Sequence, residues 1–133
     1  MNAPLIIAGA LGIVAALIHG GAGEVFVVRR LSPGALAPSP FGGPGMTRAM
    51  IQVTWHITTV AFLALGVALL VAGSALHGST ARGIGVVAAA GFTGFATVAV
   101  VLGGARVRPR GLLAHPGPVV LAATAALAWW GAL

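Results

Sequence analysis

Four long apolar segments fill most of the chain and limit what it can fold into. They cover approximately residues 5–28, 48–75, 84–104 and 119–133. A helix crosses the hydrocarbon layer, about 30 Å thick, with roughly 20 residues at 1.5 Å each. Alanine and leucine dominate these segments without strict alternation of apolar and polar residues, which disfavours a β-barrel. The sequence therefore predicts an all-α, integral membrane four-helix bundle that forms a single transmembrane domain over residues 1–133.

The amino-acid composition indicates that the chain is embedded in a lipid bilayer. Charged residues make up 6% of it and hydrophobic residues 59%, and its mean hydropathy is +1.07. A soluble domain needs about a quarter of charged residues to cover its surface. Cysteine is absent, which excludes disulfides, Cys-ligated metals and thiol catalysis. We expect a multi-pass protein of the bacterial inner (cytoplasmic) membrane in contact with membrane lipids, and no nucleic-acid partner.

Arginines are distributed unevenly over the connections between the apolar segments. The first connection is flanked by Arg29, Arg30 and Arg48, the third contains Arg106, Arg108 and Arg110, and the second has only Arg82. Because positively charged connections stay in the cytoplasm, both termini are predicted outside and the two longer loops inside. The first loop, residues 32–45, is rich in proline and glycine and reads as a surface linker.

The first segment carries IHGGAGEVFVVRR, which contains the one acidic residue of the chain. On a helix, small residues form a stripe that we expect to pack against another helix, because small side chains let membrane helices approach closely. This helix-packing stripe consists of Gly12, Ala16, Gly20 and Gly23. His19 and Glu24 lie on its two flanks, about 140° apart at 100° per residue.

The second segment carries TRAMIQVTWHITT, and one side of its helix is polar. Arg48, Gln52 and His56 recur every four residues on this side. Counted from the cytoplasmic ends, His19 and His56 share a depth of roughly 12 to 14 Å. Threonines of the third and fourth segments fall near that depth, so a polar layer is expected to cross the bundle. Besides the two histidines, it comprises Glu24, Arg48, Gln52, Trp55, Thr59, Thr93 and Thr97, with Thr124 nearby.

The same residues allow several kinds of chemistry. His19 and His56 could bind a cofactor as axial ligands of haem iron, and with Glu24 they could bind a divalent transition metal. Glu24 lies more than one turn nearer the cytoplasm, so the metal site requires a distortion of the helix at the glycines or a long reach. A proton relay or a quinone site would use the same side chains. The structural alternative is a pair of hydrogen-bonded core histidines and an ion pair between Glu24 and Arg48, Arg29 or Arg30, of which Arg48 is expected first.

These two motifs carry a resemblance. HGGAGEVFVVRRL followed by TRAMIQVTWHITT resembles small four-helix bacterial membrane proteins of uncharacterised function, whose pattern is His, then Gly-Glu and an arginine, followed by Trp-His. The resemblance covers the first half of the chain and implies His19, Gly23, Glu24, Trp55 and His56 as functional positions. It implies no activity.

A second similarity concerns small fluoride channels, whose first and third helices are similar to GGAGEVFVVRR and GFTGFATV. The chain departs from that family in important places. Its one asparagine, Asn2, lies outside the predicted membrane segments, and the family's Thr-Thr-Phe-Ser element is missing between Thr93 and Thr97. We therefore do not favour a fluoride channel.

Three functional classes follow from the sequence. The first is a non-enzymatic accessory or scaffolding subunit that packs against other membrane subunits or forms a homo-oligomer, as its 21 glycines suggest. The second is an intramembrane cofactor, quinone or proton-handling site on His19, Glu24 and His56. The third is an oligomeric channel or transporter. An enzyme is not favoured, because no nucleophile is evident beyond threonines and Ser74 or Ser79.

Overall fold

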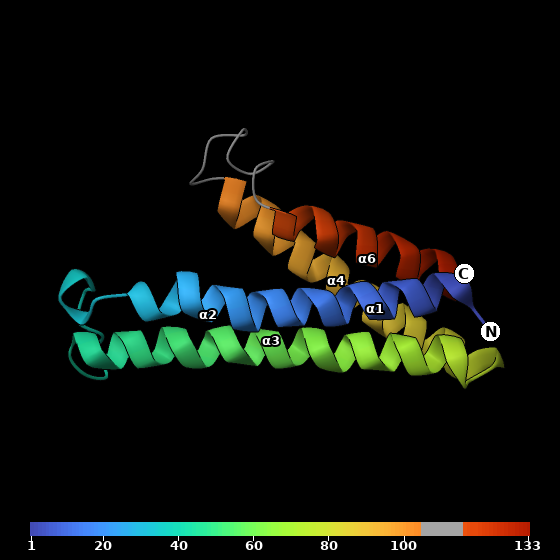
Figure 1. The fold of residues 1–133 in the computed structure, drawn as a ribbon, viewed down its shortest axis with the longest axis horizontal. Coiled ribbons are helices and arrows are strands. Elements are labelled where there is room, and N and C mark those ends of the chain that lie inside the picture. The colour runs from blue at the N-terminus through green and yellow to red at the C-terminus, as the bar shows by residue number, and fades with distance from the viewer. Residues whose placement is uncertain (105–115) are drawn as a thin grey trace. The chain divides into compact units, whose positions relative to one another are not determined.

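The computed structural model describes residues 1–104 and 116–133, and this part of the chain is helical (Figure 1). An isolated bridge between Ser39 and Gly42 is the one extended pairing in it. In chain order the elements are α1 (Ala3–Leu17), the π-helical turn η1 (Ile18–Ala22), α2 (Gly23–Phe26), the 3₁₀ turns η2 (Val28–Arg30) and η3 (Pro33–Ala35), α3 (Pro44–Ser74), α4 (Gly78–Gly104) and α6 (Pro116–Ala132).

Three helical segments of the described residues are long and apolar enough to cross a membrane. They are Ala3–Arg30, Pro44–Ser74 and Gly78–Gly103. The all-α class is thereby confirmed for the described residues, and the length and apolar composition of these three segments fit a membrane protein. Two boundaries differ from the sequence prediction: α3 begins at Pro44, since proline suits the first turn of a helix, and α4 already begins at Gly78. The arginines at 106, 108 and 110, which weigh on the predicted orientation, lie outside the described residues.

The chain divides into two compact units. The first consists of Met1–Ala15 and Phe62–Leu133, and the second of Ala16–Ala61. The first unit holds the start of α1, the end of α3, and the helices α4 and α6. The second unit holds the π-turn η1, α2, the Pro/Gly-rich loop and the first half of α3.

In the first unit, glycines bring α1 and α3 close together. A Cβ atom added to Gly9 would lie 2.6 Å from the backbone nitrogen of Leu70, and one added to Gly66 would lie 2.8 Å from that of Ile13. Neither position has room for a side chain. Such close approach is how membrane helices gain van der Waals contact without help from the hydrophobic effect.

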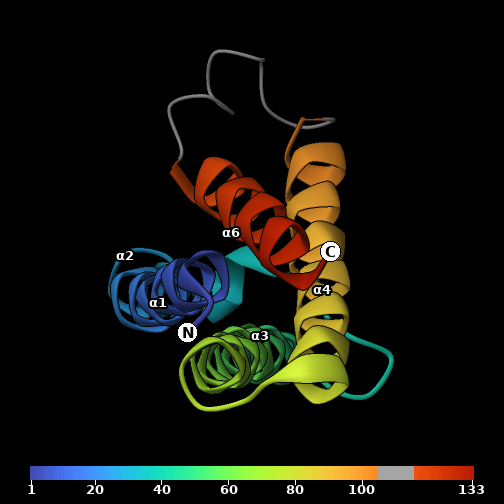
Figure 2. The same cartoon turned by 90° about the vertical axis from the view of Figure 1, so that its right-hand side faces the viewer.

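The remaining core of the first unit is aromatic and alanine-rich. Phe92 is fully buried and contacts Phe62 and Phe95. The rings of Phe62 and Phe95 lie edge to face, with 4.8 Å between their centroids. Helix α6 packs against α4 (Figure 2). At the end of α6 the guanidinium of Arg82 donates to the carbonyl oxygens of Ala132 and Leu133, at 3.0 Å each, and so satisfies acceptors that a helix terminus leaves open.

Candidate functional site

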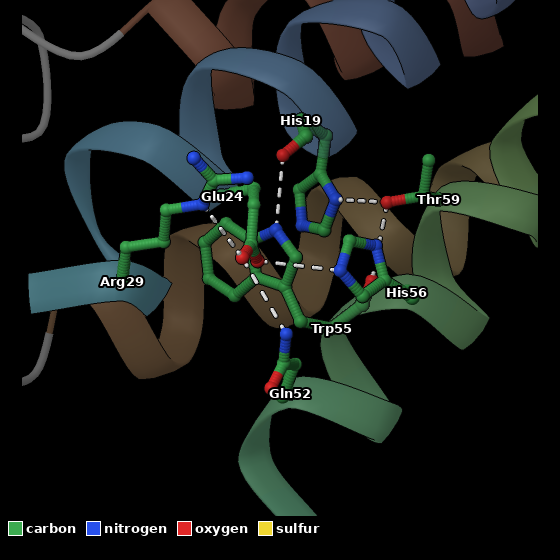
Figure 3. A network of polar contacts seen from close by, with 7 residues as sticks. All are labelled: His19, Glu24, Arg29, Gln52, Trp55, His56 and Thr59. Carbon is green, nitrogen blue, oxygen red and sulfur yellow. Dashed lines mark hydrogen bonds and ion pairs between the residues drawn. The ribbon is translucent and has the colours of Figure 1, made fainter. Parts of the chain in front are cut away.

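The second unit contains a cluster of polar side chains between the first helical segment and α3 (Figure 3). We call it the polar cluster. Its members are His19, Glu24, Arg29, Gln52, Trp55, His56 and Thr59. The π-turn, α2 and η2 supply the first three, and α3 supplies the other four. All except Arg29 were singled out in the sequence as cofactor ligands or members of the polar layer.

A π-helical turn shapes the first side of this cluster. The backbone N–H of Gly23 donates to the carbonyl oxygen of Ile18, five residues earlier, so the turn holds one residue more than an α-helical turn. In a regular helix His19 and Glu24 would be about 140° apart around the axis. The wider turn reduces this angle and moves Glu24 toward the face that carries His19. A site that combines His19 and Glu24 requires a helix distortion at the glycines, and the π-turn provides it.

Glu24 occupies the centre of the cluster. Its Oε2 atom lies 3.3 Å from Nε2 of His56, and its Oε1 atom accepts from Nε2 of Gln52 and Nε of Arg29, both at 3.4 Å. The Glu24 side chain is 16% exposed, whereas that of Arg29 is 69% exposed. The carboxylate is therefore held away from bulk solvent by an amide, an imidazole and one cation at the surface.

His19 is fixed by three contacts with α3. Its Nδ1 atom lies 2.9 Å from the hydroxyl oxygen of Thr59, and its ring stacks on that of Trp55 at 4.3 Å between centroids, with 12° between the planes. The indole N–H of Trp55 in turn donates to the backbone carbonyl of His19 at 2.9 Å. A carbonyl of the π-turn thus gains a partner, and the imidazole gains a defined orientation.

The glycines of the predicted packing stripe contact neighbouring side chains of their own chain. A Cβ atom on Gly20 would lie 2.6 Å from Cγ2 of Thr59, and one on Gly23 would collide with the indole of Trp55. Gly12 meets Phe92 in the first unit, and Ala16 is buried. The absence of a side chain at Gly20 and Gly23 therefore allows Thr59 and Trp55 to pack against the π-turn.

The ion pair expected between Glu24 and Arg48 does not form. Glu24 pairs instead with Arg29 and His56, and the Nε atom of Arg48 is buried without a hydrogen-bond partner among the described residues. The reason is local geometry: Arg29 follows Glu24 by five residues on η2 and folds back to it, while Gln52, one turn beyond Arg48 on α3, already donates to Glu24.

The threonines of α4 and α6 that were expected in or near the polar layer make their hydrogen bonds inside the first unit. Thr93 donates to Ala89 and accepts from the indole N–H of Trp129 at 3.1 Å, and Thr97 donates to Thr93. Thr124 is buried and donates to Val120. Each hydroxyl thus gives its proton to its own helix.

A metal ion finds no complete ligand set in the described part of the chain. No three His, Asp or Glu side chains converge there as ligands. A haem fits poorly as well, because one ring face of His19 lies on Trp55 and Nε2 of His56 faces the carboxylate of Glu24. The Oε2 atom of Glu24 has no hydrogen-bond partner among the described residues and lies 3.3 Å from an imidazole nitrogen of His56, a separation suited to proton exchange between the two groups.

One surface feature beside the cluster was missed in the sequence. An open groove of about 360 Å³ is lined by His19, Met50, Ile51, Thr54, Trp55 and Thr58. The available signal was the spacing of Thr54 and Thr58, which places two hydroxyl groups one turn apart next to Trp55.

Comparisons of the chain with protein-family models, with curated proteins and with solved structures found no match. The resemblance to four-helix membrane proteins with the His, Gly-Glu and Trp-His pattern stays a prediction.

Proposed function

We propose that this chain is a small integral membrane protein that handles protons, with Glu24 and His56 as an exchanging pair. One observation carries the proposal: an acid and an imidazole lie 3.3 Å apart on two helical segments that are apolar enough to span a membrane. Ionisable groups within membrane segments are costly and are typical of proton relays.

The contacts suggest an order for the relay. Arg29 is largely exposed and marks the water side, Glu24 follows, and His56 is its partner on α3. Thr59 follows His56 by three residues on α3, and its hydroxyl oxygen is hydrogen-bonded to Nδ1 of His19. No hydrogen bond joins His56 to Thr59 among the described residues, so this step requires the Thr59 hydroxyl to turn from the carbonyl oxygen of Trp55 toward His56. Protons would pass between the surface at Arg29 and the imidazole of His19, which lines the groove.

Trp55 offers a direct test of this relay. Its indole is stacked on His19, so protonation of the imidazole alters the indole's surroundings and its emission. We suggest the full chain in lipid nanodiscs with Trp129→Phe and Trp130→Phe, followed by stopped-flow fluorescence after a pH step. Glu24→Gln and His56→Gln should each slow the response by a factor of about ten or more, since each removes a proton carrier.

A matched control is Val53→Leu, an exposed apolar position on α3 outside the polar cluster. It should leave the rate unchanged. Equal rates in the parent protein, Glu24→Gln and His56→Gln would show that His19 exchanges protons without this pair, and the relay would be wrong.

We also propose the finer architecture predicted by the sequence. The helices α1, α3, α4 and α6 would form a four-helix membrane bundle with both termini outside and the loop around Gly42 in the cytoplasm, in a bacterial inner membrane. The arginine distribution supports this orientation, because positively charged connections remain in the cytoplasm.

A second candidate function is that of an accessory subunit in a homo-oligomer or larger complex. It is favoured by Ala90 and Gly94, which are exposed, one turn apart on α4, with open space where a Cβ on Gly94 would point. Small residues at this spacing suit a second helix. Gly94→Ile should then reduce cross-linked oligomers in membranes, and Val101→Ile, an exposed change on the same helix, should not. Equal cross-linking in both variants would exclude this surface.

A further inference from the structure

The groove beside the polar cluster has the dimensions and lining of a small-molecule site. Its volume of about 360 Å³ falls in the lower part of the range for ligand pockets, about 300 to 1,000 Å³. Met50, Ile51 and the indole of Trp55 supply apolar surface, while two threonines and one histidine supply polar atoms. An apolar pocket with a few placed polar groups is the usual form of such sites.

The position of the groove selects a ligand that dissolves in the membrane. Thr54 and Thr58 lie ten and fourteen residues beyond the start of α3 at Pro44, which is about 15 to 21 Å along a helix. The helix is one of the three apolar segments long enough to span a membrane. A ligand arriving there comes from the lipid phase, and the stacked indole and imidazole suit a flat ring.

Hydrogen bonds around His19 indicate which polar groups the ring of a bound ligand should carry. The hydroxyl of Thr59 donates to the carbonyl oxygen of Trp55 at 3.2 Å, because a carbonyl can only accept. With its one proton engaged, Thr59 accepts from Nδ1 of His19. A neutral imidazole that carries its proton on Nδ1 has an accepting Nε2.

The second polar wall of the groove is also an acceptor. Thr58 donates its hydroxyl proton to the carbonyl oxygen of Thr54 at 3.1 Å, so its oxygen offers lone pairs. The Thr54 hydroxyl, which also lines the groove, can donate or accept. The two accepting groups, on His19 and Thr58, complement a ligand that brings two hydrogen-bond donors, and hydroxyl groups on a flat ring provide these whereas carbonyl groups do not.

We propose that the groove binds the head group of a lipid-soluble aromatic diol of the quinol class, with its ring on the apolar floor and its hydroxyl groups facing His19 and Thr58. This inference rests on the proposed relay, because the diol would be the proton-carrying molecule next to His19. The groove would bind the diol reversibly, and with higher affinity than the oxidised quinone form.

The test uses the full chain in lipid nanodiscs with Trp129→Phe and Trp130→Phe, so that Trp55 is the remaining indole. Decylubiquinol, kept reduced, is titrated while Trp55 emission is recorded, and decylubiquinone is titrated in parallel. We expect saturation at one diol per chain, with about tenfold weaker binding of the quinone. Thr58→Val removes an acceptor and should weaken diol binding by a similar factor, and Thr54→Leu should obstruct the groove.

Val53→Leu serves as the control on the same helix and should bind the diol normally. Emission that changes in proportion to the ligand dissolved in lipid, without saturation, would overturn the proposal, as would equal affinity for diol and quinone. Glu24→Gln separates the two proposals. If it slows His19 protonation while the parent fails to bind the diol, the groove proposal alone is wrong; saturable diol binding with an unchanged protonation rate contradicts the relay alone.

Discussion

The carboxylate of Glu24 and the imidazole of His56 meet across two helical segments, with Oε2 and Nε2 3.3 Å apart. The π-turn Ile18–Ala22 allows this contact by turning the residues that follow it toward α3. Such wide turns interrupt the regular helical ladder and are frequent at functional sites. The backbone distortion and the contact between the ionisable groups thus belong to one arrangement.

The first prediction concerns the energetic coupling of Glu24. Glu24→Gln and His56→Gln should each lower the free energy of unfolding, and the double variant should recover part of the loss, with a coupling of about 1 kcal/mol or more. The same cycle with Arg48→Gln should be additive within about 0.5 kcal/mol, because Glu24 and Arg48 form no ion pair. Unfolding by SDS in mixed micelles measures all variants. Stronger coupling to Arg48 than to His56 would contradict the structure.

The second prediction compares three neighbouring glycines. Gly20→Ala and Gly23→Ala should each destabilise the protein by about 1 to 3 kcal/mol, since the added methyl group collides with Thr59 or Trp55. Gly21→Ala is the matched control, because a Cβ there meets nothing within 4 Å. Alanine at this position should stabilise the folded protein by about 0.4 to 1 kcal/mol, because it lowers the conformational entropy of the unfolded chain. Equal effects of the three substitutions on SDS unfolding would rule out this packing.

The sequence predicted the helical class correctly, because long apolar runs depend on local composition. Four-residue spacing also singled out residues that the structure brings together in the polar cluster. Gln52 and His56 lie on the face of α3 toward Glu24, as the spacing indicates. The depth count at a uniform rise separated Glu24 from the histidines by more than one turn. That count was misleading because it cannot include a π-turn, whose register depends on contacts such as that of Trp55 with His19.

The ion-pair partner of Glu24 was also predicted incorrectly from the sequence. Depth along a regular helix favoured Arg48 as the cation for Glu24, yet the chain beyond α2 tightens into η2 and returns Arg29 to the carboxylate. The groove was missed for a related reason. Its lining joins residues of α3 to His19 on the π-turn, and their combination depends on tertiary packing.

The third prediction tests the orientation. A reporter inserted near Gly42 should indicate the cytoplasm, and one fused after Leu133 should indicate the outside, because six of the seven arginines flank or occupy the two longer connections. Paired phosphatase and fluorescent-protein fusions measure the two locations. A cytoplasmic reporter after Leu133 would contradict the proposed arrangement of four spans.

The most direct measurement of the Glu24–His56 pair is infrared difference spectroscopy of the full chain in lipid during a pH titration. The chain has one acidic side chain, so the carboxyl band that disappears in Glu24→Gln belongs to Glu24. Because the imidazole of His56 lies 3.3 Å from Oε2 of Glu24, we expect His56→Gln to shift the frequency of the Glu24 carboxyl band, whereas His77→Gln, outside the polar cluster, leaves it unchanged. A Glu24 band at the same frequency in the parent and in His56→Gln would contradict the contact on which proton exchange between these two residues depends.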